Sequence, residues 1–225
     1  SEPGQLKTEL ERLGLDYYVY KHVKVSGNID QRDFEELNAH SFKSIDLSGS
    51  TVVAYGYAEA DAIPEGAFWM NTALQHFKMP KGVVTLGVNA FRQTGLQDID
   101  LPATIRNFGL NTFWGCHSLA DVYMHHQEAP SWISWCVFYN KGNEVSRTLH
   151  LYPGCKAKYE AYQYTQNWIV NFDAVVEDLT TGILRPTLSE KNKNSVIYDL
   201  NGRSLPQTLP SSGLYIQNGK TFIKK

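Results

Sequence analysis

The sequence predicts an α/β fold in which short coils of chain stack into a right-handed solenoid with a parallel β ladder. Pairs of apolar residues recur along the chain, and three of the five steps between them span 22 or 23 residues. The pairs are Val23/Val25, Ile45/Leu47, Phe77/Met79, Ile99/Leu101, Val122/Met124 and Leu149/Leu151. Strands this short cannot bury a face alone, so they become stable when each stacks on its neighbours.

A second apolar column supports the same fold. Phenylalanine recurs once per coil, and an apolar residue stands five positions before each one. The column comprises Phe68, Phe91, Phe113 and Phe138, preceded by Ile63, Leu86, Phe108 and Ile133. We expect these side chains to point inward and stack coil on coil, with short helices or irregular turns on the faces away from the ladder. Extra residues in two longer coils, at 55–61 and at 127–132 or 141–144, should bulge outward.

The domain boundaries follow from changes in this pattern. We expect a solenoid over residues 1–177, with an N-terminal helical cap over 1–19, repeats over 20–155 and a C-terminal cap over 156–177. Leu6, Leu10 and Leu13 have helical spacing before Gly14, and Asp30 is expected to cap a short helix ending near Leu37. The polar stretch 178–195 is typical of a linker. Two Asn-Gly turns predict a small antiparallel β-hairpin domain over 196–225.

Composition excludes several classes of partner. Lysine and arginine total 21 against 23 acidic residues. The chain therefore has no excess of positive charge that would favour binding to nucleic acid. No apolar run approaches the roughly 20 residues of a membrane-spanning helix. The chain starts without an export signal, which fits a cytosolic protein or a mature exported segment. Its three cysteines are interpreted mainly as buried small apolar residues, and a bridge between Cys116 and Cys136 is the alternative in an oxidising compartment.

One repeat carries a resemblance to a known family. The stretch Leu96-Gln-Asp-Ile-Asp-Leu-Pro, running on to Asn111-Thr-Phe-Trp-Gly-Cys-His, resembles the BspA-like leucine-rich repeat, and the likeness covers residues 42–155. The C-terminal hairpins resemble a short β module of exported proteins from gut and oral anaerobic bacteria. The resemblance implies export, exposure at the cell surface or in the medium, and adhesion to host or microbial proteins. It implies neither catalytic residues nor a cofactor.

The residues between the apolar ones should point outward as two polar rows, spaced by about 4.8 Å per strand. One row is Ser44, His76, Asp98, Asp121 and Thr148, and the other is Asp46, Lys78, Asp100, Tyr123 and His150. We expect this face to bind a protein, with Tyr123, Lys78 and His150 as anchors and the acidic residues Asp98, Asp100 and Asp121 setting selectivity. His76 completes the predicted site on the strands.

Signals for chemistry are weak. His76 beside Asp98, and Asp98 beside Asp121, could serve acid-base chemistry, but an open ladder offers no enclosed pocket. The histidines His117, His125 and His126 lack ligand-spaced cysteine or glutamate partners, and no hydrolase, protease or nucleotide-binding motif is present. We therefore expect a non-enzymatic protein without metal or cofactor, and rank a hydrolase-like enzyme third.

Clustered aromatic residues support the second hypothesis, a glycan-binding module. Trp132, Trp135, Phe138 and Tyr139 lie close together in the sequence, near Tyr123 in the preceding strand. Exposed rings of this kind stack on sugar rings, whereas core packing is the competing interpretation of the same residues. Trp132 is included as a candidate ligand contact.

Overall fold

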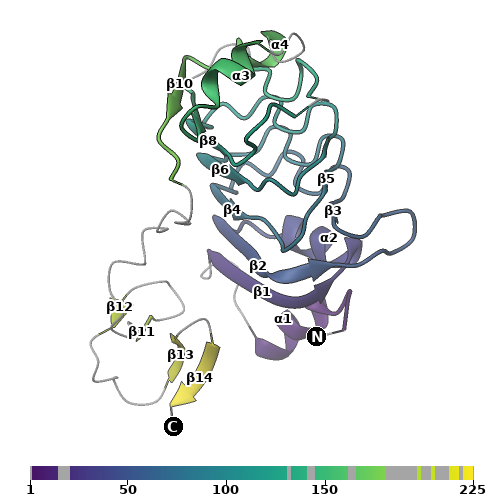
Figure 1. Cartoon of the computed structure of the whole chain (residues 1–225). Coiled ribbons are helices and arrows are strands. Elements are labelled where there is room, and N and C mark those ends of the chain that lie inside the picture. Colours follow the sequence, from purple (N-terminus) through teal and green to yellow (C-terminus); the bar gives the residue numbers. More distant parts are fainter. Residues whose placement is uncertain are drawn as a thin grey trace.

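The computed structural model describes residues 2–14, 21–130, 133–140, 145–161 and 166–180, together with four strands of the C-terminal segment (Figure 1). Trp132 and the expected insertion at 141–144 lie outside the described residues, as does most of the stretch 178–195. Apart from those gaps, every coil of the repeat region is described.

The ladder is built from parallel strands, one per coil. They are β1 (His22–Ile29), β2 (Ser44–Val52), β4 (His76–Lys78), β6 (Asp98–Leu101), β8 (Asp121–Met124), β9 (Thr148–Leu151) and β10 (Ala174–Glu177), which follow one another in Figure 1. They form two hydrogen-bonded sheets, β1-β2-β4 and β6-β8-β9-β10. Between the sheets, the Gln97 N–H donates to the Gln75 carbonyl oxygen at 2.9 Å. The repeat pattern therefore yields the expected α/β arrangement of parallel strands.

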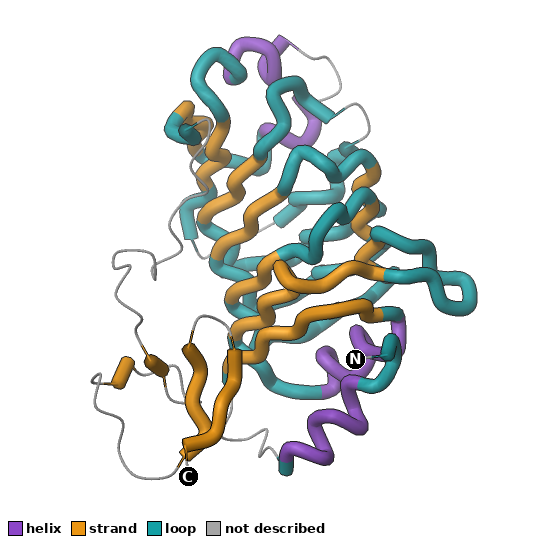
Figure 2. Tube along the Cα trace, turned by 60° about the horizontal axis from the view of Figure 1, so that its bottom comes forward, coloured by secondary structure: helices purple, strands orange, loops and turns teal. Residues whose placement is uncertain are grey.

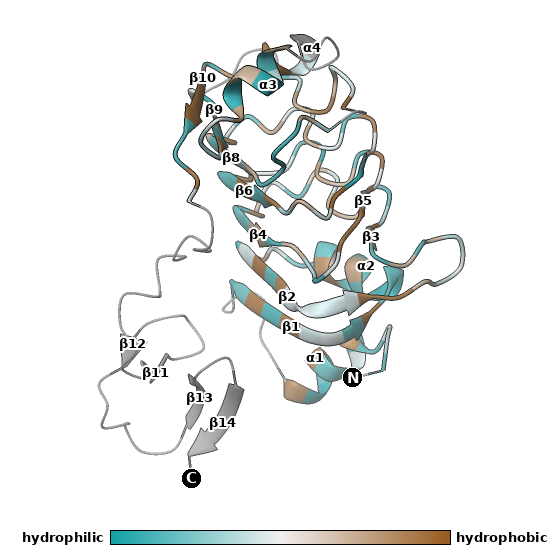
Figure 3. Cartoon of the chain, viewed as in Figure 1, coloured by the Kyte–Doolittle hydropathy of each residue, from teal (hydrophilic) through white to brown (hydrophobic). Residues whose placement is uncertain are grey.

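The register of these strands confirms the pairing predicted from the sequence. Ile99 pairs with Val122, and Val122 pairs with Leu149. All three side chains are fully buried. In the first half of β2, buried apolar residues alternate with more exposed polar ones, and the brown and teal hydropathy bands of Figure 3 follow that order. Alternation with period two places one side of the ladder on the core and leaves the other open.

A second, shorter ladder covers another face of the coils. Its strands are β3 (Ala62–Ile63), β5 (Thr85–Leu86) and β7 (Asn107–Phe108), paired in parallel, and Figure 2 shows loops joining the two ladders. Between the ladders runs the predicted phenylalanine column. The centre of the Phe91 ring lies 5.5 Å from that of Phe68 and 5.4 Å from that of Phe113. The ring centres of Phe113 and Phe138 are 5.3 Å apart. The inward stacking of this column is confirmed.

A tight turn precedes each of the phenylalanines Phe68, Phe91 and Phe113. Two residues before the ring, Asn89 and Asn111 adopt φ of 57°, as Gly66 does at 63°. Asparagine and glycine tolerate this left-handed conformation best, because the short side chain or missing Cβ avoids the backbone clash. The turn before each ring therefore carries asparagine or glycine, whereas the turn after it holds Met70, Gln93 or Gly115 at positive φ.

The N-terminal end is closed by two helices. α1 (Leu6–Leu13) ends at Gly14, and α2 (Gln31–Ala39) begins after Asp30, whose side chain accepts from the Arg32 N–H. The buried Asp33 carboxylate accepts from three backbone N–H groups, those of Asp30, Gly4 and Leu6, at 2.7 to 2.9 Å. Both predicted helices are present, and Asp33 ties the first to the second.

The C-terminal end differs from the expectation of a cap alone. α3 (Lys156–Ala161) and α4 (Gln166–Ile169) are followed by β10, which pairs with β9 and extends the ladder by one strand. The sequence pattern missed β10 because Glu177 stands where the other strands carry a second apolar residue. Buried Trp168 packs 5.5 Å from Phe138 and closes the core at this end.

The insertion at 55–61 projects from the fold. Tyr55 and Ala58 exchange backbone hydrogen bonds, and Tyr57 at its tip is fully exposed. The three cysteines are all buried with free thiols, so the alternative bridge between Cys116 and Cys136 is absent. None of the helices described is both long and apolar enough to cross a membrane.

The C-terminal strands pair antiparallel with one another. They are β11 (Ile197–Tyr198), β12 (Ser204–Leu205), β13 (Gly213–Gln217) and β14 (Lys220–Lys224), in the order β12-β11-β13-β14. Gln217 pairs with Lys220, which brackets the second predicted Asn-Gly turn.

Candidate functional site

The open side of the long ladder, here called the strand face, carries the predicted polar rows. Register pairs Ser44 with His76, Asp98 with Asp121, and Asp100 with Tyr123. Two further residues join the rows at β1, where His22 pairs with Ser44 and Lys24 with Asp46. Sequence reasoning missed them, although each flanks Val23 as the other row members flank their apolar residue.

The first strands present a basic cluster. The Asp46 carboxylate lies 3.4 Å from Lys24 Nζ and 3.7 Å from Lys78 Nζ. Burial of this carboxyl opposes ionisation, but hydrogen bonds from Ser48 and the two ammonium groups hold the pKa of Asp46 below its usual range. Lys78 keeps about half of its side chain exposed, so a positive charge remains available at this end.

The middle strands present carboxylates paired with imidazoles. His76 Nδ1 lies 2.7 Å from Asp98 Oδ2. His125 Nε2 lies 2.9 Å from Asp100 Oδ1, while its Nδ1 lies 2.8 Å from the Tyr152 hydroxyl. These contacts order the rows, and the side chains of Asp98 and Asp100 stay 43% and 53% exposed.

His150 is not the exposed anchor that the sequence predicts. It is only 7% exposed, because its ring lies between two carboxylates and against an aromatic ring. Nε2 lies 2.9 Å from Asp121 Oδ1, Nδ1 lies 2.9 Å from Asp178 Oδ1, and the Tyr123 ring is centred 4.4 Å away. The expectation failed because Asp178, one coil further along, covers the imidazole. His150 positions its neighbours, while Tyr123 remains half-buried.

The aromatic cluster divides between core and surface. Phe138 is buried, whereas Trp135 is 56% exposed and packs edge-on against Tyr139 at 5.3 Å. A stack that sequence reasoning missed continues from Tyr139 along the coils. Tyr139 lies 6.4 Å from Trp114, and the Arg92 guanidinium lies 4.5 Å from the Trp114 ring. The sequence does carry a signal for this stack, because each of its members directly follows a core phenylalanine.

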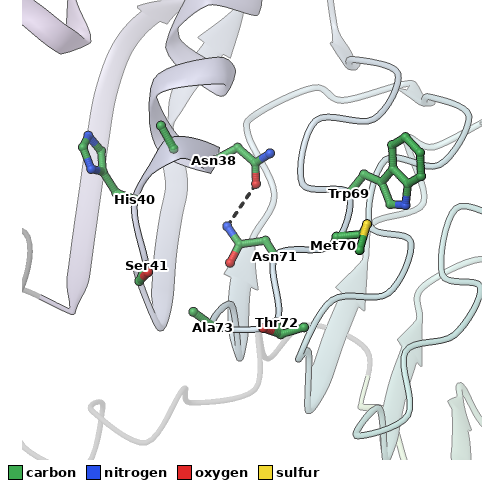
Figure 4. Close-up of a pocket in the computed structure, with 9 residues that line it drawn as sticks. Asn38, His40, Ser41, Trp69, Met70, Asn71, Thr72 and Ala73 are labelled. Atoms are coloured by element: carbon green, nitrogen blue, oxygen red, sulfur yellow. Dashed lines mark hydrogen bonds between the residues drawn. The ribbon is translucent and has the colours of Figure 1, made fainter.

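A shallow pocket of about 240 Å³ lies at the other end of that stack, between the end of α2 and the turn at 69–73 (Figure 4). Its walls include the exposed Trp69 and Met70 and the polar Asn38 and Asn71. Asn71 Nδ2 donates to Asn38 Oδ1 at 3.1 Å. The pocket holds no acidic side chain and only one histidine, His40.

Groups suited to catalysis are not enclosed. Asp98 and Asp121 are cross-strand neighbours on an open surface, and His76 contacts Asp98 at the same surface. Across the described ranges, no three histidine, cysteine or acidic side chains are placed to hold a metal ion. The arrangement suits contact with a large partner better than enclosure of a small substrate.

The repeat architecture agrees with a family comparison. The family model described as BspA type leucine rich repeat region matches residues 28–143 in six copies. The chain belongs to the BspA-type leucine-rich repeat family. No curated protein matches it.

Membership of the BspA-type family bears on function. Domains of this family are typically surface modules for protein interaction and are generally non-enzymatic. The exposed polar rows of the strand face are consistent with such a binding role.

Proposed function

We propose that this BspA-type protein is a secreted or cell-surface, non-enzymatic adhesion protein that binds a host or microbial protein through its strand face. The exposed, ordered charges of Lys78, Asp98 and Asp100 carry the proposal. Parallel strand pairing fixes the backbone of these residues. The strand face is therefore ordered before a partner binds, and binding costs little conformational entropy on this side of the interface. Tyr123 adds apolar area between the polar groups.

The proposed architecture is a right-handed solenoid over residues 1–177. Residues 178–195 are proposed as a linker and 196–225 as a separate small β domain. In this arrangement the strand face supplies binding area while the C-terminal unit lies outside the repeats.

A binding assay tests the proposed face. The protein is immobilised and probed with a panel of purified host extracellular and microbial surface proteins. For each binder, the double variant Lys78→Ala/Tyr123→Ala should weaken affinity by about 10-fold or more, because central charged and aromatic anchors dominate interfaces. The matched control Arg106→Ala/Leu110→Ala alters exposed residues beside the other ladder and should leave affinity unchanged. Equal affinity of the wild type and the Lys78/Tyr123 variant would contradict the proposal.

Glycan binding is the second candidate, favoured by the exposed rings of Trp69 and Trp135. Trp69 lines the pocket together with two asparagine side chains, and amides beside an indole suit the hydroxyl groups and apolar faces of a sugar. A glycan array compares the wild type with Trp69→Ala and Trp135→Ala. Retention of every array signal in both variants would exclude this candidate.

A further inference from the structure

Charge is segregated along the strand face. The described lysines of the rows, Lys24 and Lys78, lie on β1 and β4, and exposed Lys43 precedes β2. Burial lowers the pKa of His22, and the nearby His76 and Lys43 lower it further, as expected beside positive charge. Asp46, the carboxylate at this end, is shared between the two lysines.

The other end of the face is acidic. Asp98, Asp100 and Asp121 keep 42% to 53% of their side chains exposed. Within the described residues, these three carboxylates contact histidine nitrogens and form no ion pair with lysine or arginine. Asp178 extends the acidic region past β10 and contacts His150. These histidine contacts order the three carboxylates on the face and leave about half of each side chain exposed.

The distance between the two ends sets the length of a matching ligand. Lys24 on β1 and Asp121 on β8 are separated by four strand-to-strand steps, through β2, β4 and β6. At about 4.8 Å per step this is about 19 Å. An extended peptide that rises about 3.3 Å per residue covers it with roughly six residues.

We infer that the strand face selects a protein segment with opposite charges at its two ends, acidic against Lys24 and Lys78 and basic against Asp98, Asp100 and Asp121. This inference rests on the proposed function and names the kind of partner. Complementary charge fixes the register of a segment lying across the strands, while like charges at either end reject single-sign ligands. Tyr123, paired with Asp100 in the register, offers a ring beside the carboxylates where an arginine of the partner can stack.

Three labelled synthetic peptides of equal length test the inference on the full chain. One carries two acidic residues, a neutral spacer of about two residues and two arginines, so that its charges lie within about six residues; the others replace the charged pairs with acidic residues only or arginines only. By fluorescence anisotropy in about 0.02 M salt, the mixed peptide should bind at least about tenfold more tightly than either control. About 0.5 M salt should abolish the difference.

Charge-reversed variants locate the two contacts. Lys78→Glu should weaken the mixed peptide and favour the arginine-only peptide, and Asp100→Lys should weaken the mixed peptide and favour the acidic one. Arg106→Glu, a reversal beside the other ladder, should change nothing. Equal binding of mixed and single-sign peptides, or insensitivity to both strand-face reversals, would overturn the inference.

The outcome stays distinct from that of the proposed function. One outcome is that the affinity of a natural partner falls with Lys78→Ala/Tyr123→Ala and stays unchanged with both charge reversals. In that case the strand face binds the partner, and the inferred preference for opposite charges at the two ends is wrong. If the mixed peptide and both charge reversals give the expected results but the partner binds the double variant as tightly as the wild type, the charge preference of the face is correct and the proposed partner site is wrong.

Discussion

Arg147 donates a hydrogen bond from Nη1 to the carbonyl oxygen of Phe138 at 2.7 Å, inside the apolar core. The same guanidinium donates to the carbonyl oxygens of Leu119 and Cys116, each at 2.9 Å. Burial lowers the pKa of Arg147, while Cys116 and Asp173 oppose that shift. The coil lacks the apolar residue that leads the others, since Ser146 stands there, and Arg147 fills the space while capping three carbonyls.

Replacing Arg147 with methionine should destabilise the protein by about 3 kcal/mol, because buried carbonyl oxygens lose their donors. Chemical denaturation measures the change. The matched control is Arg106→Met, at an exposed position, where a change within about 0.5 kcal/mol is expected. A similar small change at position 147 would show that these hydrogen bonds contribute little.

Acid should destabilise the fold through His126. Its Nε2 donates to the Ile105 carbonyl at 2.6 Å, and its buried Nδ1 has no partner among the described residues. Burial lowers the pKa of His126 from 6.5; the bond to Ile105 opposes this shift, and the charges of Arg106 and His125 add to it. The unfolded chain therefore binds a proton at a higher pH than the folded chain, and stability is lost as the pH falls below 6.5.

The variant His126→Gln should reduce that loss, because a glutamine amide cannot gain the second proton. Melting temperatures measured from about pH 7.5 to about pH 5 should fall less steeply for this variant than for the wild type. His117→Gln, at an exposed histidine, serves as control. If the His126 variant kept the wild-type slope, another group would be responsible.

Asp33 should control docking of the first helix. Asp33→Ala removes the acceptor for the Gly4 and Leu6 N–H groups and half of the capping box of α2, at a cost of about 2 kcal/mol. Hydrogen exchange should then speed up across residues 6–13 while the core strands stay protected. Glu35→Ala, on the exposed side of α2, should leave exchange unaltered. Unchanged protection of α1 in the Asp33 variant would mean that other contacts hold it.

Close packing of coils should make Gly109 intolerant of a side chain. A Cβ built there lies 2.4 Å from the backbone of Gly87 and Val88 in the preceding coil. Gly109→Ala should therefore cost about 1–3 kcal/mol through overpacking, measured by urea unfolding. Asn107→Ala, at an exposed position in the adjoining strand β7, is the control. A neutral Gly109 variant would imply that neighbouring coils can separate freely.

Features repeated in every coil could be predicted from the sequence, because each copy supports the same assignment. Periodic spacing alone predicted the pairing of Ile99 with Val122 and the stacking of Phe91 on Phe113. Features that occur once could not be predicted. Arg147 is charged and follows a serine, so nothing in its local pattern indicated complete burial.

The candidate site was predictable only in its rows. Alternation placed Lys78 and Asp100 on the open side correctly, since that depends on local strand geometry. The burial of His150 depends on Asp178, 28 residues away in the sequence. Asp178 follows β10, a strand that the apolar pattern did not predict because Glu177 is not apolar. The stack of Trp114 and Tyr139 depends on side-chain geometry between coils, which spacing does not specify.

Site-specific photo-crosslinking to a partner from the binding panel locates the surface that the partner contacts. A benzophenone side chain replaces Asp100 on the strand face or Leu110 beside the other ladder, both exposed in the structure. Binding through the strand face should give a covalent adduct with the partner from position 100 and none from position 110. An adduct from position 110 with none from position 100 would contradict binding through the strand face.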